Sequence, residues 1–114
     1  MCGIVGIYKR AGIDADAMLK FVDMLSRCQS RGYDATGVVN ASMRCIKGKV
    51  PSRTFIGFPK FKEWADESIG GRFVIGHCRQ ATRGDPSDNS NNHPVPVIDN
   101  GKKVYVVHNG IVTD

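Results

Sequence analysis

Glycine and proline interrupt this sequence so often that only short helices and strands fit between them. Thirteen glycines and five prolines are spread over 114 residues, and both residue types favour turns and disrupt helix interiors. This spacing argues against a helical bundle. No stretch approaches the roughly 18 apolar residues that a membrane-spanning helix needs, so no membrane association is predicted.

The segments between these breaks carry strand and helix patterns. Apolar residues recur at helical spacing over residues 16–29, where Asp14 or Asp16 can cap the start and Gly32 suits a left-handed end. A second helix is expected from Pro59. Strands are predicted over residues 3–8, 37–42, 44–47, 73–78 and 103–108, with a loop over 84–92. Because strands and helices do not alternate strictly, we expect one α+β domain with a mainly antiparallel sheet.

The charges favour no particular partner. The net charge is +5, but the basic residues are scattered in ones and twos, without the basic stripe and interleaved aromatic residues of nucleic-acid-binding proteins. Nucleic acid is therefore not predicted as a partner. The N-terminal segment lacks the basic and apolar regions of a secretory signal. A cytoplasmic location is expected, where cysteines stay reduced.

The cysteines do not form a recognisable zinc motif. They stand at positions 2, 28, 45 and 78, with no Cys-x-x-Cys spacing. His77, Cys78 and His93 could in principle join a metal ion, but none is predicted. Cys28 and Cys45 are interpreted as small buried apolar residues.

Cys2 has the clearest chemical potential. Removal of Met1 would leave Cys2 with a free α-amine, whose ordinary pKa of about 7.7–8.0 lets it accept a proton near neutral pH. One residue would then supply both a nucleophilic thiolate and its base. On position alone, Cys2 could equally be an incidental residue at the start of a core strand.

Further segments decide between these interpretations. The chain resembles the glutaminase domain of class II glutamine amidotransferases, which are N-terminal-nucleophile hydrolases. The glucosamine-6-phosphate synthase type is the nearest comparison. The matching segments, in the family's order, are Met-Cys-Gly-Ile-Val-Gly (1–6), Arg-Gly-Tyr-Asp-Ala-Thr-Gly (31–37), Gly-His-Cys-Arg-Gln-Ala-Thr-Arg-Gly (76–84), Asn-His-Pro (92–94) and Val-His-Asn-Gly (107–110). The resemblance implies an αββα sandwich and no cofactor.

The resemblance also implies roles in hydrolysis of the glutamine side-chain amide to glutamate and ammonia. Cys2 would be the nucleophile. The Asn109 side-chain amide and the Gly110 backbone N–H would stabilise the tetrahedral oxyanion, whose hydrogen-bond donors each contribute roughly 2.7–4 kcal/mol. The Asn-Gly pair by itself is also a common turn sequence.

The same resemblance indicates how glutamine would be held. Arg79 would pair with its α-carboxylate, a role for which the guanidinium fork is well suited, with Thr82 beside it. Arg31 would steady the N-terminal strand. Gly32 and Gly37 would meet backbone requirements, and His93 and His108 would pack or form hydrogen bonds rather than act as bases.

The chain departs from the family's pattern in three respects. Gln80 stands where the family often has Trp, and Arg83 stands where it often has His; both border the glutamine pocket. The family's domain also continues to an Asp that holds the glutamine α-amine, and Asp114 follows Asn109 too closely to be that residue. Residues 1–114 are thus expected to form the N-terminal part of such a domain, completed by a partner chain or by another copy.

Two alternatives to glutamine hydrolysis remain open from the sequence. One is a catalytically impaired binding or regulatory remnant of the same fold. The other is an N-terminal-nucleophile amidohydrolase that acts on a different amide.

Overall fold

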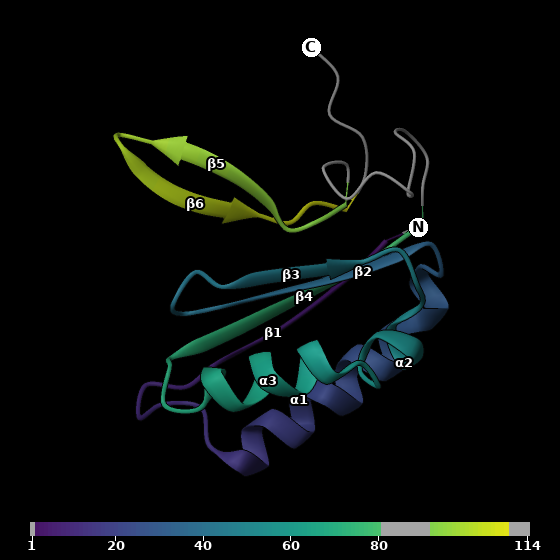
Figure 1. Ribbon diagram of the computed structural model, residues 1–114, viewed down its shortest axis with the longest axis horizontal. Coiled ribbons are helices and arrows are strands. Elements are labelled where there is room, and N and C mark those ends of the chain that lie inside the picture. Colours follow the sequence, from purple (N-terminus) through teal and green to yellow (C-terminus); the bar gives the residue numbers. More distant parts are fainter. Residues whose placement is uncertain (1, 81–91, 110–114) are drawn as a thin grey trace.

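The computed structural model describes residues 2–80 and 92–109 as a layered α+β fold (Figure 1). Four strands form one sheet in the order β1-β4-β2-β3, and β5 and β6 form a separate hairpin. The helices lie on one side of the sheet and the hairpin on the other (Figure 1). The described elements, in chain order, are β1 (Gly3–Tyr8), α1 (Ala15–Arg27), the 3-10 helix η1 (Cys28–Arg31), β2 (Ala35–Asn40), β3 (Cys45–Gly48), α2 (Ser52–Phe55), α3 (Pro59–Ser68), β4 (Phe73–Arg79), β5 (Val95–Asp99) and β6 (Lys102–Val106).

Every strand pairing in the two sheets is antiparallel, which confirms the predicted sheet type. β4 lies between β1 and β2, with Gly3 opposite Cys78 and Ala35 opposite Arg79. All six residues of β2 are buried, because the helices cover one face of this strand and the hairpin the other. The described layers are consistent with an αββα sandwich.

Helix α1 forms where the apolar stripe predicts it. Asp14 caps its start by accepting a hydrogen bond from the Ala17 backbone N–H at 2.8 Å. The helix buries Ala17, Met18, Phe21 and Leu25 against the sheet. It ends at Arg27 and tightens into η1, two residues earlier than predicted.

The predicted left-handed conformation at Gly32 is wrong. Gly32 is extended, with φ of −167°, so its backbone conformation does not require glycine. Its backbone instead lies so close to β4 that an added Cβ would be 2.4 Å from the carbonyl carbon of Arg79. Glycine is needed here for close approach.

Two short elements were not predicted. Strand β5 contains Pro96, which cannot donate to a strand ladder and therefore argues against a strand; the hairpin accommodates it opposite Tyr105. Helix α2 has only four residues, too few to show a helical pattern. The predicted loop over 84–92 lies outside the described residues except for Asn92.

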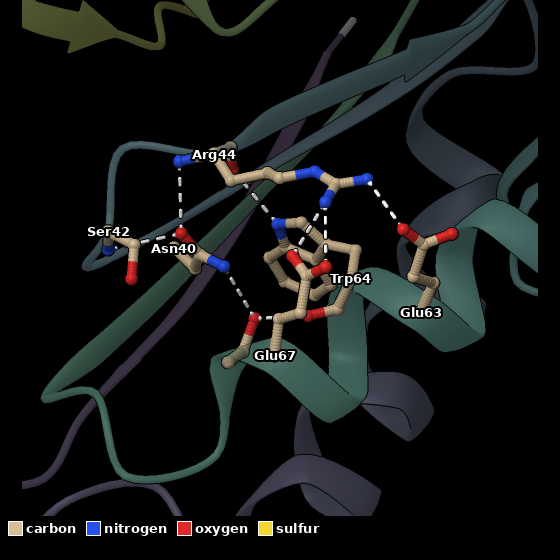
Figure 2. A network of polar contacts seen from close by, with 7 residues as sticks. Asn40, Ser42, Arg44, Glu63, Trp64 and Glu67 are labelled. Carbon is tan, nitrogen blue, oxygen red and sulfur yellow. Dashed lines mark hydrogen bonds and ion pairs between the residues drawn. The ribbon is translucent and has the colours of Figure 1, made fainter.

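The turn between β2 and β3 is fastened to α3 by polar contacts (Figure 2). Asn40 Nδ2 donates to Ser68 Oγ at 3.0 Å, and its Oδ1 accepts the backbone N–H groups of Ser42 and Arg44. Trp64 Nε1 donates to the Arg44 carbonyl, also at 3.0 Å. Trp64 is fully buried, so these contacts hold the helical layer against the sheet.

Among residues 2–80 and 92–109, no helix is long and apolar enough to cross a membrane.

Candidate active site

Cys2 lies at one end of the four-stranded sheet, beside the end of β4. It directly precedes β1, and its Sγ donates to the carbonyl oxygen of Gln80 at 3.6 Å. Continuing the register beyond Gly3 and Cys78 places Cys2 opposite Arg79. Residues directly opposite in an antiparallel pair point to the same face of a sheet, so Cys2 and Arg79 share the face that carries the hairpin.

A pocket of about 500 Å³ opens beside Cys2 at the edge of the sheet. It brings together three residues to which the sequence assigns roles: Cys2, Arg31 and Asn109. They come from the start of the chain, from η1 and from the segment after β6. The complete lining is Cys2, Gly3, Ile4, Val5, Met24, Arg27, Cys28, Arg31 and Asn109.

Arg79 does not line this pocket. Its side chain is buried, and Nη1 donates to Asn92 Oδ1 at 2.7 Å. The Arg79 carbonyl accepts from the Asp34 backbone N–H at 2.9 Å, beside the close approach of Gly32. The end of β4 is thus held firmly on both sides. Thr82 and Gly110, also predicted as site residues, lie outside the described residues.

Two histidines enclose the backbone just before Asn109. His77 Nε2 lies 2.9 Å from the His108 carbonyl oxygen, and the His108 backbone N–H donates to His93 Nδ1 at 3.0 Å. The His77 and His93 rings stack with centroids 4.5 Å apart and planes 17° apart. The interpretation of His93 as a hydrogen-bonding residue is confirmed, whereas His108 takes part in these contacts through its backbone.

Burial makes both of these rings hard to protonate. Burial lowers the pKa of His77 to about 4 against the opposing effect of the hydrogen bond to His108, and the nearby His93 and Arg79 lower this pKa further. Burial likewise lowers the pKa of His93, with Arg79, His108 and Lys47 adding to the effect. Both imidazoles are therefore neutral at pH 7.

Cys28 is a second thiol in the pocket. Its hydrogen bond with Cys78 lowers the pKa of Cys28 to about 7, and the Arg31 charge acts in the same direction against the effect of burial. The Cys28 Sγ also packs on the backbone of Gly3: a Cβ added there would be 2.2 Å from this sulfur. Cys28 is buried as predicted, but it is more acidic than an ordinary apolar cysteine.

Searches for similar proteins give a consistent result. The glutamine–fructose-6-phosphate aminotransferase of Corynebacterium glutamicum is 41% identical over 98% of this chain. Those of Bradyrhizobium diazoefficiens and Sulfolobus acidocaldarius are 38% and 35% identical over the same share. The chain is a class II glutamine amidotransferase-like domain. This domain spans 17–18% of the length of these relatives.

Other comparisons add nothing to this assignment. No protein-family model matches the amidotransferase-like domain. A chain in a complex of a beta-clamp processivity factor and the little finger domain of PolIV covers 75% of it, with a TM-score of 0.46 and 12% identity over 93% of that chain. A likeness this weak carries no argument about fold or function.

The sequence of the amidotransferase-like domain did not indicate every residue of the site. His77 was considered only as a metal ligand, although the two-residue period of a strand places it on the same face as Arg79. No group of three or more metal-binding side chains occurs among the described residues. Cys28 had no sequence signal, because its acidity depends on Cys78, which is distant in the chain.

Proposed function

We propose that this domain hydrolyses the side-chain amide of glutamine, with Cys2 as the nucleophile once Met1 has been removed. The observation that carries the proposal is that Cys2 and Asn109, from opposite ends of the chain, line one pocket. A nucleophile and an oxyanion donor in one cavity are the minimum arrangement for acyl transfer.

The reaction follows from these groups. The Cys2 α-amine takes the thiol proton, and the thiolate attacks the carbonyl carbon of the glutamine amide. The Asn109 side chain and the Gly110 backbone N–H donate to the resulting oxyanion. The C–N bond then breaks, and ammonia leaves with a proton returned by the α-ammonium group. Water attacks the thioester and releases glutamate, and the ammonia passes to an acceptor.

The glutamine backbone would be held by charge and hydrogen bonds. Arg79 pairs with the α-carboxylate, Thr82 contributes beside it, and Arg31 steadies β1. The fixed position of Arg79, held by Asn92 on the same sheet face as Cys2, supports this role. Since Arg31 lines the Cys2 pocket, replacing each arginine by lysine separates the two roles. Arg79→Lys should raise KM for glutamine more than Arg31→Lys, and the reverse order would assign the carboxylate to Arg31.

We propose that the domain has the αββα sandwich fold of N-terminal-nucleophile hydrolases. We also propose that the protein is located in the cytoplasm.

The β5–β6 hairpin exposes the apolar side chains of Val97, Ile98, Val104 and Val106. An apolar surface of this kind is typical of a site that binds further polypeptide. We propose that another copy of the chain covers it. Sedimentation should then show self-association that Ile98→Lys weakens; a monomer at all concentrations would contradict this.

The test compares ammonia release by wild-type protein, Cys2→Ala and Cys45→Ala. Intact mass establishes first whether Met1 has been removed. Cys45 is half-buried beneath the hairpin and contacts the Pro94 carbonyl, so Cys45→Ala is a matched control for loss of a thiol elsewhere. We expect Cys2→Ala to abolish ammonia release and Cys45→Ala to retain it. Equal release by wild type and Cys2→Ala would overturn the assignment.

A further inference from the structure

The backbone that leads into Asn109 is held from two sides by stacked imidazoles. Residue 108 follows β6, so its polar groups lie beyond the strand ladder. His77 binds its carbonyl at 2.9 Å, and His93 binds its N–H at 3.0 Å. The carbonyl belongs to the peptide plane that joins residues 108 and 109, and the N–H belongs to the preceding plane. Fixing both planes fixes the direction in which the chain enters Asn109.

The partners determine which nitrogen of each ring carries the proton. A carbonyl oxygen only accepts, so His77 Nε2 must carry a hydrogen and its Nδ1 must not. A backbone N–H only donates, so His93 Nδ1 must be unprotonated and its hydrogen must lie on Nε2. Each ring is thus held in one neutral tautomer. The buried Nδ1 of His77 has no hydrogen-bond partner within the described part of the chain.

Protonation of either ring would oppose this arrangement. A proton on His93 Nδ1 would remove the acceptor for the His108 N–H. A proton on His77 Nδ1 would be buried without an acceptor, beside a stacked second ring. The charged and titratable groups that act on the pair are Arg79 from β4, Lys47 from β3 and His108 from the segment after β6, and none of them is acidic.

We propose that His77 and His93 are positioning residues that, as a pair of neutral imidazoles, hold the backbone of residue 108 so that Asn109 donates to the oxyanion. This inference rests on the proposed function. It assigns the histidines no proton transfer. Their contribution is to keep one donor where charge develops, and a misplacement of about 1 Å can cost about 100-fold in rate.

Paired variants separate the hydrogen bonds from simple packing. His93→Asn keeps an acceptor near the Nδ1 position, whereas His93→Leu has a similar shape without one. His77→Gln keeps a donor near the Nε2 position, whereas His77→Met does not. We expect the Leu and Met variants to lower kcat by about 10- to 100-fold with little change in KM, and Asn and Gln to recover most of the loss. Equal losses in both members of a pair would overturn the proposal.

A double-mutant cycle tests whether the effect passes through Asn109. If His93 acts only by positioning that side chain, His93→Leu should cost nothing further in an Asn109→Ala background. Additive losses would contradict the proposal. Tyr105→Phe, on β6 of the same hairpin, is the control and should leave kcat unchanged.

Imidazole ¹⁵N NMR provides a readout that does not depend on activity. Near pH 7, His77 and His93 should each show a protonated Nε2 and an unprotonated Nδ1, and His93→Leu should speed exchange of the His108 amide hydrogen. A charged ring or an Nδ1–H tautomer would overturn the proposed positioning role of His77 and His93. If the wild type releases no ammonia but shows these tautomers, the proposed function fails, whereas the way the two histidines hold the backbone of residue 108 is supported.

Discussion

Single side chains in the site depend on contacts from several elements. His77 lies on β4, stacks on a residue that precedes β5 and binds a carbonyl that follows β6. Gly3 lies on β1 and leaves room for the Cys28 thiol. The addition of one carbon atom or one proton at these residues should therefore change the stability of the protein measurably.

The low pKa of His77 predicts a loss of stability in acid. In the unfolded chain this histidine binds a proton below its ordinary pKa of 6.5, whereas the folded protein resists protonation until about pH 4. The stabilising effect is therefore fully present above pH 6.5 and is lost as pH falls toward 4, by roughly 3 kcal/mol for this residue alone. Denaturant unfolding from pH 7 to pH 4 should show a steeper decline for wild type than for His77→Gln. Identical slopes would contradict the assignment.

Gly3→Ala should destabilise the start of β1. The new Cβ would be 2.2 Å from Cys28 Sγ and 2.9 Å from Arg31 Cβ, and overpacking of this kind typically costs about 1–3 kcal/mol. Gly6→Ala is the matched control on the same strand, since its nearest contact is an acceptable 3.4 Å. Urea unfolding measures both variants. Equal free energies of unfolding for Gly3→Ala and Gly6→Ala would show that the residues around Gly3 can move without destabilising the protein.

Secondary-structure elements are joined by buried polar side chains as well as by the apolar core. Asn40 at the end of β2 serves both the following turn and α3 (Figure 2). Arg44 adds ion pairs to Glu67 and Glu63 at 2.7 and 3.4 Å, but exposed pairs of this kind contribute little.

Replacement of Asn40 should therefore cost more than replacement of Arg44. Asn40→Ala leaves the backbone N–H groups of Ser42 and Arg44 without their acceptor, an effect worth about 1–3 kcal/mol. Arg44→Met should cost less than about 1 kcal/mol. Thermal or urea unfolding gives both values, and a larger loss for Arg44→Met would reverse this ranking of interactions.

The sequence predicted the secondary-structure elements better than the contacts between them. The apolar stripe of α1 is visible because this helix shows one face to the core. β1 and β4 are visible as short β-rich segments bounded by turn residues. Pro96 concealed β5, which belongs to a two-stranded hairpin and is therefore an edge strand, where proline is tolerated. The roles of Gly32 and His77 could not be predicted from neighbouring residues, because each depends on an atom contributed by a distant segment.

At the scale of the whole molecule, the site depends on how the layers pack on one another. Helices cover one face of the sheet, and the β5–β6 hairpin covers the other (Figure 1). The hairpin side approaches β2 closely at Gly37, where an added Cβ would be 1.9 Å from the His93 carbonyl oxygen. The position of Asn109 therefore depends on how closely the hairpin lies on β2.

Gly37→Ala should displace the hairpin and reduce turnover. We expect kcat to fall by at least about 10-fold, because shifts near 1 Å at the oxyanion donor are costly, while the Cys2 thiol remains able to react. Ammonia release and alkylation of Cys2 by iodoacetamide measure the two effects separately. Unchanged kcat would mean that the hairpin position does not control the site.

The proposed nucleophile can be tested most directly by trapping the acyl-enzyme. Protein mixed with glutamine and quenched in acid is digested with trypsin, which separates residues 2–9 from residues 28–31. This separates Cys2 from Cys28, the other thiol of the pocket. The account predicts a γ-glutamyl group on the peptide that begins with Cys2, in protein lacking Met1. A γ-glutamyl group on the Cys28 peptide, or turnover by protein that retains Met1, would contradict it.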